Sequence, residues 1–121
     1  MLNGGVAKYE VGPIKASYKT PNWHPEGPQG WSFSVTSDPV DGGAPHRRLL
    51  DAISAAHPHM ALNVEDADSS GYYLEGSILW QGAEIVIWAE ALEGFLYIWS
   101  LEREPIEAIH TEAGIQATRI F

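Results

Sequence analysis

Histidine, glutamate and aromatic side chains are the residues of this 121-residue chain whose types and spacing could support chemistry. His57 and His59 flank a single proline, and two histidines at that spacing can share one face of a strand and a metal ion. No third ligand stands at a fixed spacing from them, because His24, His46 and His110 are distant in sequence. We therefore interpret His57 as a helix-terminal residue that interacts with the helix dipole, and we expect no metal site and no cofactor.

The segment from Asp66 to Gly71 (DADSSG) imitates the first half of an EF-hand calcium loop. Its first, third and fifth positions carry oxygen ligands and its sixth is glycine, as such a loop requires. The twelfth position is Ser77 instead of a bidentate glutamate, and the flanking residues favour strands over helices. A turn between two strands explains the segment better, since Asp, Ser and Gly tolerate turn conformations.

Enzymatic signatures are missing from the chain. It has no nucleophile elbow, phosphate-binding loop or dinucleotide-binding glycine pattern. The absence of cysteine excludes disulfide scaffolds, cysteine nucleophiles and thiolate metal sites. Carboxylate pairs such as Glu84 and Glu90 would be solvated on an open sheet face, without the burial that tunes catalytic pKa values. We therefore expect that the protein is not an enzyme.

Charge is segregated along the chain, whose formal net charge is −9. Up to Met60, five basic side chains balance five acidic ones. Beyond Met60, Arg103 and Arg119 stand against eleven acidic residues. A field of this sign repels nucleic-acid phosphates and anionic membranes and attracts cationic partners. We therefore expect a basic protein partner and no binding to nucleic acid or membranes.

The pattern of apolar residues predicts one domain, residues 1–121, of the α+β class. Pro45 opens a main helix that ends near His57, where a proline follows. Pro105 opens a shorter helix to Ala113, with Gly114 ending it. The expected architecture is an antiparallel sheet of about five to seven strands with one main helix packed on one face. Strands are predicted at residues 6–11, 14–19, 31–36, 59–64, 72–80, 83–92, 95–102 and 115–121.

Turns containing glycine set the pairing of these strands. Gly12-Pro13 is expected to join the first two strands in a hairpin, and two-residue turns are expected to join the three strands of a C-terminal meander. This register predicts Trp88 opposite Trp99 and Glu90 opposite Tyr97. One face of the meander is then apolar and predicted to be core: Tyr72, Leu74, Ile78, Ile85, Ile87, Ala89, Leu96 and Ile98.

The opposite face of the meander combines glutamates with aromatic side chains and is the leading candidate for a binding site. Trp and Tyr provide large, rigid contact areas, and carboxylates select a cationic partner. The alternative is that the N-terminal strands or the C-terminal segment cover these aromatic rings. The candidate partner-binding residues are Glu75, Glu84, Trp88, Glu90, Tyr97 and Trp99.

The leading functional hypothesis is an inhibitor or immunity-type protein that neutralises a basic partner such as a toxin. The first residues lack the basic and apolar regions of a secretory signal, so we expect a cytoplasmic protein. Two other classes remain open. The aromatic face could bury a homodimer interface in an assembly subunit. A Pro- and Gly-rich loop at residues 20–30 could complete a small-ligand or enzyme pocket lined by Trp23, His24, His57 and His59.

Overall fold

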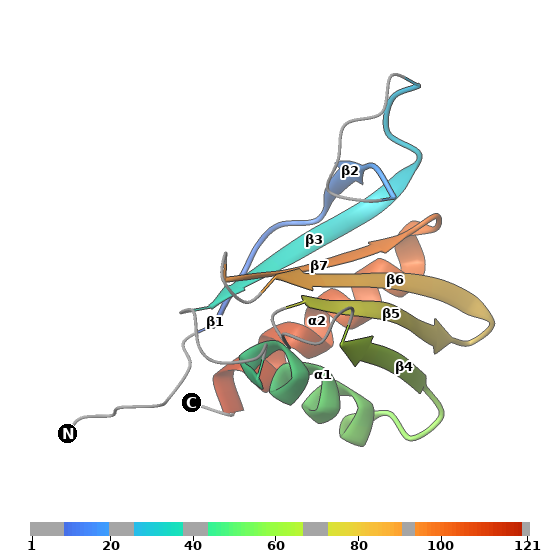
Figure 1. Ribbon diagram of the computed structural model, residues 1–121. Helices are drawn as coiled ribbons and strands as arrows, with labels where there is room; N and C mark the ends of the chain where they lie inside the picture. Colours follow the sequence, from blue (N-terminus) through green and yellow to red (C-terminus); the bar gives the residue numbers. More distant parts are fainter. Residues whose placement is uncertain (1–8, 20–25, 38–43, 67–72, 91–93, 120–121) are drawn as a thin grey trace.

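The computed structural model describes residues 9–19, 26–37, 44–66, 73–90 and 94–119. These residues form a seven-stranded antiparallel sheet in the order β1-β3-β7-β6-β5-β4, with β2 also paired to β3, and two helices (Figure 1). The α+β architecture predicted from the sequence is confirmed. Neither helix is long and apolar enough to cross a membrane. The elements are β1 (Tyr9–Val11), β2 (Lys15–Ser17), β3 (Gly30–Ser37), α1 (Ala44–Ala56), β4 (Ala61–Asp66), β5 (Tyr73–Trp80), β6 (Ala83–Glu90), β7 (Phe95–Ser100) and α2 (Arg103–Arg119).

The N-terminal strands β1 and β2 lie one after the other along the same edge of β3. Val11 pairs with Val35 and Lys15 pairs with Ser32, so the edge strand has one more residue than β3 over this stretch. The predicted hairpin at Gly12-Pro13 is therefore wrong, and these residues form a bulge. Proline lacks the N–H that a central strand needs, so a bulge in an edge strand accommodates it.

The C-terminal meander has the predicted order, with one change of register. β5 and β6 pair as the first two-residue turn predicts. Between β6 and β7, Trp88 lies opposite Tyr97 instead of Trp99, and Glu90 lies opposite Phe95 instead of Tyr97. The connection between these strands is thus four residues long, not two. Because side chains alternate with a period of two, this two-residue shift leaves every side chain on its predicted face.

The hydrophobic core lies between the sheet and the two helices. Tyr72 lies outside the described residues, and the other predicted core residues of the meander are buried. On the helices, the buried apolar residues follow the helical period: Leu49, Leu50 and Ile53 on α1, and Ile106, Ile109, Ala113 and Ala117 on α2. α2 packs on β1, β3, β7 and β6, whereas α1 packs on α2 and β4.

The C-terminal helix is longer than the sequence predicts. Gly114 does not end it, and residues 115–119 continue α2 instead of forming a strand. The apolar spacing continues through Ala117, and burial of that face outweighs the cost of about 1 kcal/mol for a helical glycine. Tertiary packing thus overrides the local helix-stop signal.

Gly76 in β5 should be among the most sensitive positions of the sheet. A Cβ atom there would lie 2.1 Å from the carbonyl oxygen of Asn63 and 2.7 Å from the Cα of Val64, and these backbone atoms cannot rotate aside. We expect Gly76→Ala to reduce the free energy of unfolding by about 2 to 3 kcal/mol in urea denaturation. Gly114→Ala is the control, because its Cβ would meet nothing within 4 Å, and it should stabilise the helix. Equal effects of the two substitutions would contradict the packing argument.

His46 in α1 should make stability depend on pH. The residue is fully buried, and neither ring nitrogen has a hydrogen-bond partner among the described residues. This burial lowers the pKa of His46 from its ordinary value to about 4. Between that pKa and the ordinary value near 6.5, the unfolded chain binds a proton that the folded chain does not.

Acidification from pH 6.5 to pH 4 should therefore lower the free energy of unfolding by up to about 3 kcal/mol through this group. His46→Leu has no such titration, so urea denaturation of the two proteins should show a difference in stability that changes across this range. The titration of carboxylates changes the free energy of unfolding equally in both proteins. A difference that stays constant with pH would show that His46 titrates normally.

Candidate functional site

The sheet has one face that neither helix covers, which we call the outer face. It is made by the side chains that alternate with the core residues of β5, β6 and β7. Most of them are exposed or half-buried, in contrast to the buried set on the helix side. All six candidate partner-binding residues lie on this face. Its members on the three strands are Tyr73, Glu75, Ser77, Leu79, Glu84, Val86, Trp88, Glu90, Phe95, Tyr97 and Trp99.

Two aromatic rings of the outer face are buried against the N-terminal edge of the sheet. Tyr97 and Trp99 are 5% and 7% exposed. The Tyr97 hydroxyl donates to the Tyr18 carbonyl and accepts from the Ser17 hydroxyl at 2.8 Å. The indole N–H of Trp99 donates to the Ser17 carbonyl at 3.3 Å. These rings therefore anchor β2 and its neighbour Tyr18 to β7, and they offer little surface to a partner.

Small residues on β3 make room for the Trp99 ring. Ser32 lies opposite Trp99 and is completely buried, and a Cβ on Gly30 would come within 2.8 Å of the indole. Glycine and serine alternate with larger residues at the start of this strand. That alternation is a sequence signal for a large neighbouring ring and points to the burial of Trp99.

Trp88 is the aromatic side chain at the centre of the acidic part of the outer face. It is half-buried, and its indole N–H donates to the Glu90 carboxylate at 3.1 Å. Glu75 lies directly opposite Trp88 on β5 and is exposed. Glu84 is exposed further along β6, opposite Leu79. The structure thus places two carboxylates, those of Glu75 and Glu90, beside a partly accessible indole, and Tyr97 lies on the other side of that indole.

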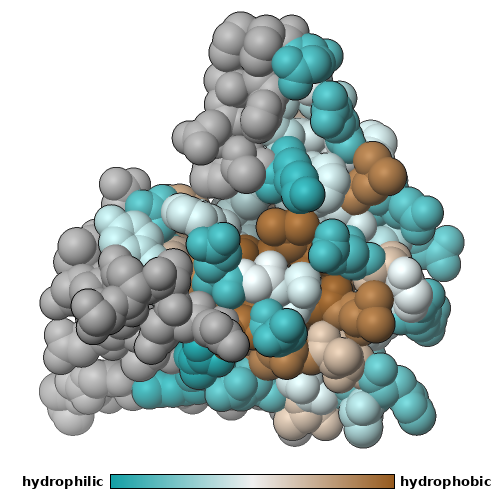
Figure 2. All heavy atoms as spheres, turned by 45° about the vertical axis from the view of Figure 1, so that its right-hand side comes forward, coloured by the Kyte–Doolittle hydropathy of each residue, from teal (hydrophilic) through white to brown (hydrophobic). Residues whose placement is uncertain are grey.

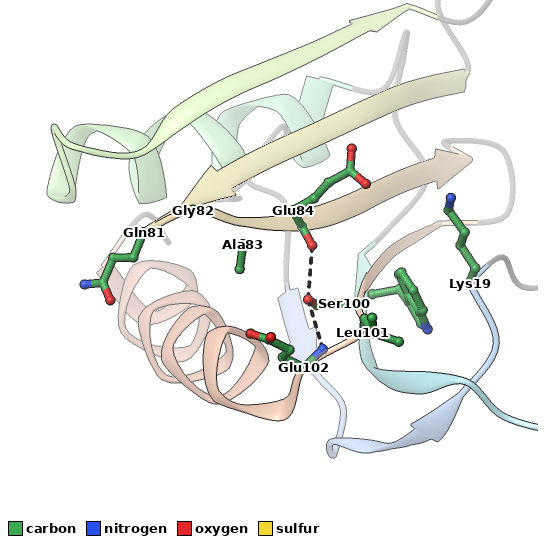
Figure 3. A pocket seen from close by; sticks show the side chains of 9 residues that line it. Lys19, Gln81, Gly82, Ala83, Glu84, Ser100, Leu101 and Glu102 are labelled. Atoms are coloured by element: carbon green, nitrogen blue, oxygen red, sulfur yellow. Dashed lines mark hydrogen bonds between the residues drawn. The ribbon is translucent and has the colours of Figure 1, made fainter.

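A cavity of about 580 Å³ lies at the end of the outer face, where β7 separates from β6. The Ser100 hydroxyl donates to the Glu84 carbonyl at 3.0 Å and accepts from the Glu102 N–H at 3.4 Å, so it links β6 to the residue that precedes α2 (Figure 3). The exposed Leu101 and the edge of Trp99 line the cavity, and Lys19 lies at the other end from the β5–β6 turn. On the side of the molecule that carries this turn, hydrophobic side chains are accessible among hydrophilic ones (Figure 2).

The histidines do not form a metal site within the described residues. No group of three or more metal-ligating side chains lies together there. His46 is in the core, and His110 contacts the Gly12 carbonyl at 2.8 Å. His57 and His59 share a smaller cavity of about 270 Å³. The other members of the predicted pocket, Trp23 and His24, and residues 67–71 of the calcium-like segment lie outside the described residues, so those predictions stay open.

Comparison of the chain with protein-family models, with curated proteins and with solved structures gives no match. The chemistry of the outer face and of the cavities is therefore the basis for a functional argument.

Tyr97→Phe tests the anchoring of β2. The substitution removes a buried hydroxyl together with its hydrogen bonds to the Ser17 hydroxyl and the Tyr18 carbonyl. We expect a loss of about 1 to 2 kcal/mol in the free energy of unfolding and faster amide exchange in β2. Tyr73→Phe, at a half-buried position of the same face, is the control and should change both quantities little. Unchanged exchange in β2 for Tyr97→Phe would argue against the anchor.

Proposed function

We propose that the chain is a non-enzymatic protein-binding domain that neutralises a basic partner through the outer face. The observation that carries the proposal is a sheet face free of both helices, on which Glu75 and Glu90 flank the half-buried Trp88 and Glu84 lies further along β6. An inhibitor or immunity-type protein that masks a cationic toxin in the cytoplasm would use such a surface.

Electrostatics supports this assignment. The formal net charge of −9 attracts a cationic protein from a distance, and the exposed carboxylates give its approach a direction. On the same face, Lys15 and Lys19 lie at the β2 end, away from β5. A partner would therefore place its positive charge over β5 and β6. Occlusion of its active site or substrate groove follows from contact alone and requires no chemistry.

The aromatic residues divide into two roles in this proposal. Trp88 provides accessible ring surface for a contact beside the carboxylates of Glu75 and Glu90. Tyr97 and Trp99 are buried, so they act by holding the N-terminal edge in place beside that contact. Partner contacts should therefore depend on Trp88 directly, and on Tyr97 and Trp99 through the shape of the sheet.

Charge reversal on the outer face tests the proposal. The partner is first captured from lysate, and its association with the chain is then measured by stopped-flow fluorescence. The triple variant E75K/E84K/E90K changes the net charge from −9 to −3. We expect the association rate constant at low salt to fall by at least about tenfold.

The matched control is D51K/E104K/E107K, which makes the same change in net charge at exposed positions of α1 and α2. Its association rate should fall much less, because its charges lie on the helices. Equal rates for the two triple variants would refute a directed acidic face. Light scattering of the free chain tests whether the outer face is instead a homodimer interface. A stable dimer that is lost in the Trp88→Ala variant would identify it as one.

A further inference from the structure

A second polar site lies away from the outer face, where the end of α1 meets α2. His57 follows the last residue of α1, and its Nε2 lies 2.7 Å from Oε1 of Glu112 on α2. Gln116, one turn further along α2, donates from its side-chain amide to the other carboxylate oxygen at 2.7 Å. Gln116 is 5% exposed. Both oxygens of Glu112 are therefore engaged, and the carboxylate is held in one orientation against the imidazole.

This arrangement determines which nitrogen of His57 carries the proton. The Glu112 carboxylate accepts the hydrogen bond from Gln116 and has no proton of its own to donate. Nε2 of His57 must then be the donor, and in the neutral ring Nδ1 keeps its lone pair. Nδ1 has no hydrogen-bond partner among the described residues and is not among their buried unpaired atoms. In the neutral ring it is therefore an acceptor of fixed orientation with accessible surface.

His57 also lines the cavity of about 270 Å³ described above. The His57 ring meets the ring of Trp80 edge-on, with centroids 4.8 Å apart. Met60, His59 and Gln81 complete the lining, and no charged carboxylate, lysine or arginine belongs to it among the described residues. The volume is close to the lower end of small-molecule sites and fits a single substituted ring.

We propose that this cavity binds a neutral aromatic ring with a hydroxyl group, of the phenol class, whose O–H donates to Nδ1 of His57. An indole and a thioether favour a flat ring, and the free acceptor selects a donor. Anions are disfavoured by the Glu112 carboxylate behind the imidazole and by the net charge of −9. A cation would leave most of its N–H groups unpaired in this lining. Glu112 and Gln116 are positioning residues, since they act through His57.

The site is tested by titrating the full-length ¹⁵N-labelled chain with p-cresol and following the indole N–H signal of Trp80. The comparison ligand is 4-methylanisole, which has the same ring and replaces the hydroxyl proton with a methyl group. We expect p-cresol to bind at least about fivefold more tightly, the ratio that one net hydrogen bond supplies. Equal affinities, or no response at Trp80, would overturn the proposal.

Two variants separate recognition from a purely structural role of the helix contact. His57→Phe keeps a ring against Trp80 and removes the acceptor, so the preference for p-cresol over 4-methylanisole should disappear. Glu112→Gln should release the imidazole from a single tautomer, visible in the ¹⁵N shifts of its ring nitrogens, and reduce the preference about twofold. Asp51→Asn on the exposed side of α1 is the control and should retain it. If His57→Phe keeps the preference for p-cresol over 4-methylanisole, Nδ1 has no role in recognition. If His57→Phe does not fold, the folded Glu112→Gln variant still tests the proposal.

A phenol group could belong to a free small molecule or to a tyrosine side chain of another protein. N-acetyl-tyrosinamide carries the same ring on a peptide-like backbone. If N-acetyl-tyrosinamide binds at least as tightly as p-cresol, the ligand is identified as a tyrosine side chain. Binding of p-cresol with exclusion of the amide would identify a free phenol. The result is independent of the acidic outer face, because neither His57 nor Trp80 belongs to that surface.

Discussion

Burial of β7 on both sides of the sheet is the constraint on which the rest of the structure depends. Leu96 and Ile98 point into the core beneath the helices, while Tyr97 and Trp99 point to the outer face and are covered by the N-terminal edge. A strand buried on both faces must lie inside the sheet. β3 and β6 flank it, and the bulged edge strand supplies the backbone carbonyls that satisfy the two polar aromatic groups.

The asymmetry of the outer face follows from this burial. On the β3 side, small residues lie under Trp99 and hydrogen bonds hold β2 in place, so the surface there is closed. On the β5 side, the strands carry glutamates and the half-buried Trp88, and that surface is open to a partner. A rigid, anchored region beside an accessible acidic region is a physical basis for specific binding, because the contact surface is ordered before a partner arrives.

The contact between the two helices has a different chemical character. A hydrogen bond between His57 and Glu112 connects the end of α1 to α2, and a second one within α2, from Gln116, holds the Glu112 carboxylate. Neither bond involves a residue of the outer face. Salt weakens interactions between exposed charges much more than it weakens hydrogen bonds between partly buried groups. The two proposed sites can therefore be examined separately, the first by charge reversal and the second by ligand chemistry.

The sequence by itself determined the fold class, the main helix and the assignment of meander side chains to two faces, because these depend on local periodicity and turn residues. It also located the negative charge in the second half of the chain. Only the tertiary structure decided that Gly12-Pro13 is a bulge, that α2 passes Gly114, and that Tyr97 and Trp99 are covered while Trp88 is not. Those outcomes depend on which distant segment packs on each surface, and that information is not contained in the spacing of neighbouring residues.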